Sequence, residues 1–89
     1  MRSVITIIGK DNVGIIAAFS AECSKYNANI IDISQKVLDD LFVMIMIVNI
    51  EGLNCKFTHF VDVLSALGKE KGLEVHTMHE DVFNAMHKI

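Results

Sequence analysis

Residues 41–48 are eight consecutive apolar residues, the longest such run in this chain of 89 residues. A membrane-spanning helix needs about 20 apolar residues, so this run is too short to cross a bilayer. Its length, and its content of Val, Ile, Phe and Met, are typical of a single strand. A strand that is apolar at every position has to be covered on both faces. We therefore expect residues 41–48 to lie in the middle of a β-sheet.

Three other segments have strand patterns. Residues 3–8 are also almost wholly apolar, with Thr6 as the only polar residue inside the run. Residues 30–38 alternate between the apolar Ile31, Ile33 and Val37 and the polar Asp32, Ser34 and Lys36, which predicts a half-exposed strand. The pair Asp39-Asp40 then separates this segment from residues 41–48, so the two should form a hairpin. Residues 73–79 are the fourth predicted strand.

Three segments have a helical spacing of apolar residues. Residues 14–27 place Ile15, Ile16, Phe19, Cys23 and Tyr26 on one face. A second helix is predicted from about residue 55 to residue 71, with Asn54 as its cap, Gly72 as its stop and a buried stripe of Phe57, Phe60, Val61, Leu64 and Leu67. Residues 80–89 are predicted to form a short terminal helix.

The predicted order is therefore strand, helix, strand, strand, helix, strand, with a helical tail. Right-handed crossovers in both strand-helix-strand units give an α+β fold of the ferredoxin-like βαββαβ type, a four-stranded antiparallel sheet with two helices on one face. The first and third strands take the centre of such a sheet, and these are the two that are apolar on both faces. We expect a single domain over residues 1–89, with its core in residues 3–79 and the tail in residues 80–89.

The second face of this sheet needs a cover. Two helices pack on one face only, which leaves Val4, Ile8 and alternate residues of 41–48 on the other. A soluble protein rarely exposes a large apolar patch. Either the terminal helix folds over this face or a second copy of the chain does, and we expect a homodimer without a choice of surface.

Composition argues against several classes of function. The net charge is −3, and the eight basic residues form no stripe interleaved with aromatic residues, so we expect no contact with nucleic acid. Cys23 and Cys55 lie in segments predicted as helical and have no paired spacing, which favours reduced thiols and a cytoplasmic location away from membranes. The four histidines, His59, His76, His79 and His87, show no recognisable spacing of metal ligands. No spacing assembles a nucleophile with a base, so we expect neither an enzyme nor a cofactor.

The loop between the first strand and the first helix is the candidate site. It reads Gly9-Lys10-Asp11-Asn12-Val13-Gly14-Ile15-Ile16. Backbone N–H groups at the start of a helix favour an anion or a carboxylate. The alternative is a plain connection in which Asp11 or Asn12 only caps the helix.

The same residues resemble a known family. Gly9-Lys10-Asp11-Asn12-Val13-Gly14-Ile15, followed by Asn29-Ile30-Ile31-Asp32-Ile33, is similar to the small-ligand-binding ACT domain over about residues 3–79. The ending, residues 80–89, resembles the tail of a small family of stand-alone ACT proteins. The chain is also similar to the ACT units of the glycine cleavage repressor, which act through other proteins.

The resemblance implies a site for an amino acid or a similar small metabolite at a dimer interface. The positions of Asp11 and Asn29 match places where ACT domains hold the ligand with side chains, and Gly14 and Ile15 match backbone contacts. With Asn12 and Val13 these residues make the expected site. Amides of residues 13–16 could donate hydrogen bonds to the ligand carboxylate, Asp11 could pair with its ammonium group, and Asn29 of a neighbouring subunit could bind either end. Many ACT loops carry proline before the second glycine, where this chain has Val13.

Two functions remain open at this point. The first is a regulatory module in which a bound metabolite, an amino acid by the resemblance, biases a dimer that a partner protein recognises. The second is an interaction or dimerisation module that uses the same fold without a ligand.

Overall fold

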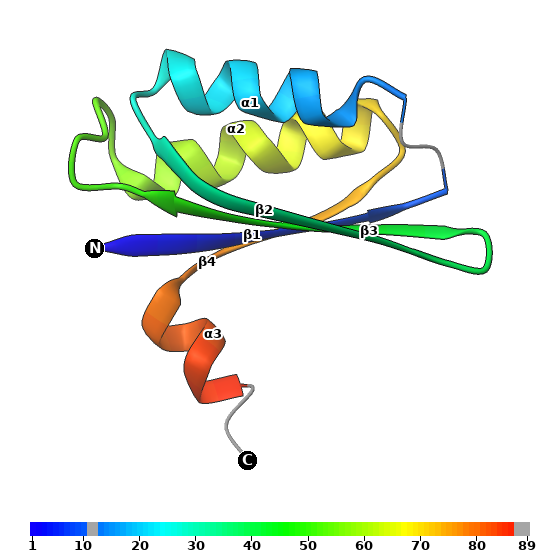
Figure 1. Cartoon of the computed structure of the whole chain (residues 1–89). Helices are drawn as coiled ribbons and strands as arrows, with labels where there is room; N and C mark the ends of the chain where they lie inside the picture. Colours follow the sequence, from blue (N-terminus) through cyan, green and yellow to red (C-terminus); the bar gives the residue numbers. More distant parts are fainter. Residues whose placement is uncertain (11–12, 87–89) are drawn as a thin grey trace.

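The computed structural model describes residues 1–10 and 13–86 and confirms the ferredoxin-like fold. Its strands form one antiparallel sheet in the order β2-β3-β1-β4, so β1 and β3 are central as predicted. The helices α1 and α2 cover one face of the sheet, and α3 lies on the opposite side (Figure 1). In chain order the elements are β1 (Arg2–Gly9), α1 (Ile15–Lys25), β2 (Asn29–Leu38), β3 (Leu41–Asn49), α2 (Phe57–Glu70), β4 (Glu74–His79) and α3 (Glu80–Met86).

The core lies between the sheet and the two helices. Side chains alternate across a strand, so every second residue of β1 and β3 points at the helices. Ile5 and Ile7 of β1 face Met46 and Met44 of β3, and all four side chains are completely buried. The helices add the buried residues Ile15, Phe19, Cys23, Phe60 and Leu64. The inward stripes predicted for the two helices are thereby confirmed at these positions.

Ile16 is an exception to the predicted inward face of α1. Its side chain is 38% exposed, whereas its neighbour Ile15 is buried. Consecutive helical residues point about 100° apart, so Ile16 lies at the margin of a face centred on Ile15, Phe19 and Cys23.

β2 departs from the alternation that the sequence predicts. Its pairing with β3 shifts between Ile30 and Asp32, which leaves Ile31 as an extra residue at a β-bulge. Ile31 and Val37 are 47% and 65% exposed, so the prediction that they share a buried face with Ile33 is wrong. The physical reasons differ: Ile31 is the extra residue of the bulge, whereas Val37 lies next to the β2–β3 turn, where the hairpin extends beyond the helices (Figure 1).

Two asparagines explain where the helices end and begin. Asn27 adopts a left-handed φ of 62° and stops α1 two residues before the predicted end, because asparagine tolerates this conformation. Asn54 was expected to cap α2, and this prediction is wrong. Its side-chain Nδ2 instead donates to the carbonyl of Lys25 at 3.1 Å, and α2 begins only at Phe57. Cys55 therefore lies before the helix and not within it.

The open face of the sheet, opposite α1 and α2, is covered in part by α3. This helix contacts β1 and β4, and Val4 is only 2% exposed. Arg2 ties the two ends together, since its Nε donates to Glu80 Oε2 at 3.0 Å and its Nη2 donates to the other carboxylate oxygen. The expectation that the terminal helix folds over this face holds for β1 and β4. The predicted helical residues 87–89 lie outside the described residues.

Candidate functional site

The loop before α1 has the backbone of a helix start. Gly14 is the N-cap residue with a left-handed φ of 73°, and its carbonyl accepts the first helical hydrogen bond from Ala18 at 3.0 Å. Glycine has no side chain with which to cap the helix, and a Cβ built at this position would meet no atom within 4 Å. Space is therefore open in front of the first turn. Asp11 and Asn12 of the predicted site lie outside the described residues.

A small pocket opens beside this helix start. It has a volume of about 190 Å³ and is lined by Val13, Ile15, Lys71 and Leu73. We call it the loop pocket. Lys71 is the C-cap residue of α2 and lines the loop pocket together with Val13 and Ile15 at the N-terminus of α1. The lysine and the helix start both favour a negatively charged group of a ligand.

Gly9 fixes the wall of this region. A Cβ at Gly9 would lie 2.2 Å from Leu73 Cδ2, so β1 has to end in glycine for Leu73 to pack there. Leu73 lines the loop pocket, so the space that Gly9 leaves free helps to set the position of one wall of the pocket.

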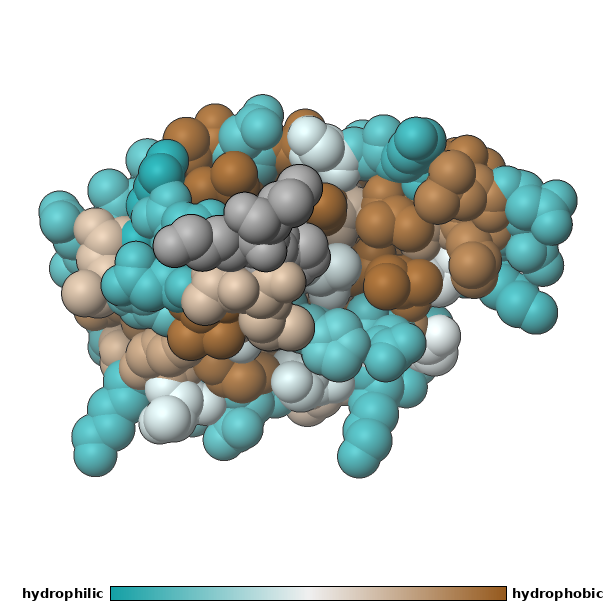
Figure 2. All heavy atoms as spheres, turned by 90° about the horizontal axis from the view of Figure 1, so that it is seen from below, coloured by the Kyte–Doolittle hydropathy of each residue, from teal (hydrophilic) through white to brown (hydrophobic). Residues whose placement is uncertain are grey.

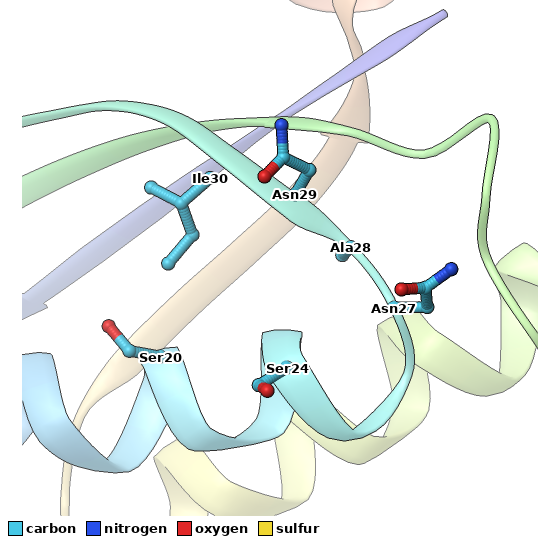
Figure 3. Close-up of a pocket in the computed structure, with 6 residues that line it drawn as sticks. All are labelled: Ser20, Ser24, Asn27, Ala28, Asn29 and Ile30. Carbon is cyan, nitrogen blue, oxygen red and sulfur yellow. The ribbon is translucent and has the colours of Figure 1, made fainter.

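A second pocket lies at the other end of α1. It has a volume of about 330 Å³, and we call it the polar pocket; it is lined by Ser20, Ser24, Asn27, Ala28, Asn29 and Ile30. Figure 3 shows Ser20 and Ser24 on α1 below the start of β2, with the side chains of Ser20 and Ile30 pointing toward each other. Asn27 is engaged elsewhere, since its Nδ2 donates to the carbonyl of Gly52 at 2.7 Å. The polar pocket presents hydroxyl and amide groups and no charged side chain.

The predicted site residues therefore fall into two groups. Val13, Gly14 and Ile15 lie at the start of α1, and Asn29 lies beyond its end. A helix of 11 residues is about 16 Å long, so one chain does not bring Asn29 to the loop. A single ligand the size of an amino acid cannot touch both groups within one copy of the chain.

Sequence reasoning missed several residues that line these pockets, among them Ser20, Ser24 and Lys71. Ser20 and Ser24 are four residues apart on the exposed side of a helix that leads to Asn29, a spacing that could have identified them. Lys71 had no such signal. It was interpreted as part of a solvated helix end, and only the packing of α2 beside the loop shows where its side chain lies.

Two of the histidines lie on β4. His76 and His79 pair with Thr6 and Ser3 of β1, three positions apart, so they point to opposite faces of the sheet. Each has an acidic neighbour instead: His76 Nε2 lies 3.2 Å from Glu74 Oε1, and His79 Nδ1 lies 3.6 Å from Asp81 Oδ2. In residues 1–10 and 13–86 no three His, Cys, Asp or Glu side chains are grouped to hold a metal ion. None of the helices in this same part of the chain is long and apolar enough to span a membrane.

Comparisons with known proteins agree with this fold, and the matches extend along nearly the whole chain. The UPF0237 protein of Listeria innocua is 42% identical over 89 residues, which cover all of both chains. The structure of an ACT domain protein from Streptococcus pneumoniae has a TM-score of 0.82, with 33% identity and 98% of each chain covered. These full-length matches confirm the resemblance to stand-alone ACT proteins, tail included.

A more distant structure shares the fold. It is described as a glycine cleavage system transcriptional repressor, and its TM-score is 0.77 at 10% identity, covering 85% of this chain and 44% of that one. The sequence pattern of the ACT domain matches residues 2–78. ACT domains are regulatory modules that bind ligands. The chain belongs to the ACT domain family.

Proposed function

We propose that this protein is a regulatory module that binds an amino acid between two copies of the chain and signals through a partner protein. The observation that carries the proposal is the division of the predicted site, with the loop pocket at the start of α1 and Asn29 in the polar pocket at its end. Two copies of the chain can bring together the two groups of site residues that a single copy keeps apart.

The edge strand β2 offers the way to pair them. It is the outer strand on the α1 side of the molecule, and the peptide groups along its outer margin have no neighbouring strand. A twofold axis perpendicular to the sheet would set β2 of the two copies side by side and antiparallel. The start of α1 in one copy would then lie next to the end of α1 in the other. This arrangement brings Gly14 of one copy toward Asn29 of its partner.

The chemistry of the two pockets suits the two ends of an amino acid. The amides at the start of α1 and the ammonium group of Lys71 would donate hydrogen bonds to the carboxylate. The side-chain oxygen atoms of Asn29, Ser20 and Ser24 would accept hydrogen bonds from the ammonium group. Asp11 and Asn12 complete the site in this proposal. We assign the module no catalytic step and no cofactor.

The proposal includes a location. Cys23 and Cys55 are both free thiols, which is the usual state in a reducing compartment. We place the protein in the cytoplasm on that ground.

A thermal-shift screen against the twenty amino acids tests the ligand. A compound that binds only the folded state stabilises it by about 2.7 kcal/mol at 100 times its Kd, which raises the Tm of a domain of this size by about 10 to 20 °C. We expect at least one amino acid to do so at millimolar concentration. If none does, the ligand-binding function is contradicted and the interaction module becomes the better description.

Gly14 provides the matched variants for this screen. Gly14→Asp places a carboxylate where the ligand carboxylate should bind, so it should abolish the shift. Gly14→Ala introduces the same strain at a φ of 73° without the charge and should keep the shift. Circular dichroism should show that both variants fold. An equal loss of response in both variants would point to strain and would refute the assignment.

The alternative function rests on an observation of its own. β2 has no fully buried residue and leaves the large apolar side chains of Ile31, Val37 and Leu38 exposed, as expected of a surface that contacts another chain. A stable dimer that responds to no amino acid would establish the interaction module.

A further inference from the structure

Two opposite charges stand on the same face of the edge strand β2. Asp32 pairs with Ile47 of β3 and Lys36 pairs with Val43, and both β3 residues point to the open face because their neighbours in the chain are buried in the core. Figure 2 views this face, and hydrophilic side chains stand at several places along its margin. Asp32 and Lys36 are exposed, and in residues 1–10 and 13–86 neither forms an ion pair.

The two charges are too far apart to pair within one chain. Asp32 and Lys36 are four residues apart on one strand with Ser34 midway between them, so their Cα atoms are about 13 Å apart. Opposite residues on neighbouring antiparallel strands have Cβ atoms only about 5 Å apart. A second copy of β2 is a neighbour that can place a lysine opposite Asp32 and an aspartate opposite Lys36 at the same time.

We propose that β2 pairs with β2 of a second copy in one register, with Ser34 beside Ser34 at the twofold axis and Asp32 opposite Lys36 of the other copy. The inference rests on the proposed function, in which two copies join along this edge, and it specifies how they align. Opposite residues of an antiparallel pair share a face of the sheet, so the twofold axis has to pass beside one residue that faces its own equivalent. Each choice of that residue is one register.

Charge distinguishes these registers. An axis beside Asp32 sets two aspartates opposite each other, and an axis beside Lys36 sets two lysines opposite each other, so both registers are destabilised by repulsion. The axes beside Ile33 and Gln35 leave both charges opposite uncharged residues. The axis beside Ser34 instead forms two pairs of opposite charge, one on each side of the axis.

The backbone of β2 permits this register. A hairpin with a two-residue turn closes on a hydrogen-bonded pair, here Leu38 and Leu41, and hydrogen-bonded and non-hydrogen-bonded pairs alternate from there along the strand. Counted from that pair, Ser34 turns its peptide groups toward β3, whereas Ile33 and Gln35 turn theirs outward. The axis beside Ser34 places Ile33 opposite Gln35 of the other copy, so outward peptide groups meet across the edge.

The same register accounts for two exposed apolar residues. Ile31 and Val37 are 47% and 65% exposed, and this register brings Val37 of one copy next to Ile31 of the other. Val37 is also level with Gly9, where the loop before α1 begins, because both pair with Phe42. The loop of one copy is thereby set beside the first residues of β2 in the other copy, where Asn29 lies.

Reversing one charge at a time tests the register. Asp32→Lys sets lysines opposite Lys36 and Lys36→Asp sets aspartates opposite Asp32, twice per dimer in each case. Each variant alone should therefore associate about tenfold more weakly than the wild type, measured as a Kd by analytical ultracentrifugation on the full chain. Mixing the two variants pairs the lysines of one copy with the aspartates of the other, so the mixture should regain the wild-type affinity. The double variant should regain it by itself.

Native mass spectrometry then gives the composition of the mixture. Asp32→Lys and Lys36→Asp change the mass in opposite directions, so the heterodimer is resolved from both homodimers. Random pairing gives about one half heterodimer, and the register predicts a fraction well above this. A mixture of Asp62→Lys and Lys56→Asp, which makes the same charge changes at two exposed positions away from β2, is the control and should give about one half.

The outcomes separate the register from the proposed function. Single variants with the wild-type affinity, or a heterodimer fraction no higher than in the control, would overturn the register and leave a dimer of the wild type standing. A monomeric wild type would overturn both the register and the dimer of the proposed function. A preference for the heterodimer without a thermal response to any amino acid would support the register and contradict only the ligand.

Discussion

At the scale of single residues, burial decides the chemistry of Cys23. Its side chain is fully buried on α1 among core residues, as predicted from its place on the apolar face. Burial raises the pKa of the Cys23 thiol to about 11, and the nearby charge of Glu22 adds to the effect. Thiolate is the reactive form of cysteine, so Cys23 should be inert in the folded protein.

Alkylation with iodoacetamide at neutral pH measures this directly. We expect Cys55, which is only half-buried, to be modified in the native protein while Cys23 reacts only after denaturation. The raised pKa also sets a sign for stability. Between the ordinary thiol pKa of 9.0 and the raised pKa of about 11 the unfolded chain ionises and the folded chain does not, so stability falls as pH rises. Cys23→Ala should lose this decline, and rapid native labelling of Cys23 would contradict the account.

The ion pair of Arg2 and Glu80 is a second feature at this scale. A hydrogen bond from Arg2 is the first cause that lowers the pKa of Glu80 below its ordinary value of 4.5, with the positive charge of Arg2 in support. A lowered pKa in the folded state means that the stabilisation is present above pH 4.5 and is lost as the pH falls through the folded-state pKa. The pair holds α3 to β1.

Hydrogen exchange of α3 amides as a function of pH should therefore show faster opening below pH 4.5. In Glu80→Gln the amides should exchange fast at every pH, because the charged pair is absent. Glu70→Gln on α2 is a control that should keep the wild-type profile. An acid-independent exchange rate in the wild-type protein would show that the pair does not hold α3.

The same scale shows what a sequence cannot reveal. The side chain of Asn54 looks like a helix cap from its position, yet it closes the end of α1, 29 positions earlier, by bonding to Lys25. A local pattern gives the residue type that a cap requires, but whether its side chain accepts from a helix N–H or donates to a distant carbonyl depends on how the chain folds back. Lys71 at the loop pocket went unpredicted for the same reason.

At the scale of elements, the contact between α2 and β4 depends on a glycine. Gly68 is buried in α2, and a Cβ there would lie 2.4 Å from Val75 Cγ2, 3.2 Å from Val75 Cβ and 3.3 Å from the carbonyl oxygen of Leu73. The helix lies against the strand at this point because residue 68 has no side chain.

Gly68→Ala should therefore destabilise the fold by about 1 to 3 kcal/mol, the usual result of overpacking. The sign is informative, since replacing a glycine by alanine in a free helix stabilises it by about 1 kcal/mol. Urea unfolding followed by circular dichroism measures the change. Ser65→Ala at an exposed position of the same helix is the control and should be neutral or slightly stabilising. A stabilised Gly68→Ala would mean that α2 does not approach β4 so closely.

Periodicity predicted the elements well because the core demands it. The spacing of Phe60 and Leu64 follows from the one buried face of α2, and the sheet order follows from the two strands that are apolar on both faces. The bulge at Ile31 was not predictable. An edge strand has no second neighbour to impose a register, so its sequence carries a weaker pattern.

At the scale of the whole molecule, the length of α1 divides the candidate site into two separate groups of residues. The residues predicted from the loop and from the family resemblance do not all meet within one chain, because α1 separates Gly14 from Asn29. No sequence pattern states whether two groups meet within one chain or between two. The shape of the monomer is what makes a shared site the simplest arrangement.

A site shared between two copies would also couple ligand binding to dimerisation. A ligand bound between two copies stabilises their association, because it binds the pair and not the separate chains. The ligand would in this way change the population of the dimer that a partner protein recognises. The same coupling is absent if each copy binds its ligand alone.

Mixing two inactive variants tests this most directly. Gly14→Asp disables the loop half of each site, and Asn29→Ala disables the other half. Equal amounts are unfolded together, refolded, and titrated calorimetrically with the amino acid that gives the largest thermal shift. Random pairing of the two variants leaves about one quarter of the sites with two intact halves, so the account predicts binding at about a quarter of the wild-type stoichiometry. A mixture that binds no more ligand than the separate variants would contradict a site shared between two copies.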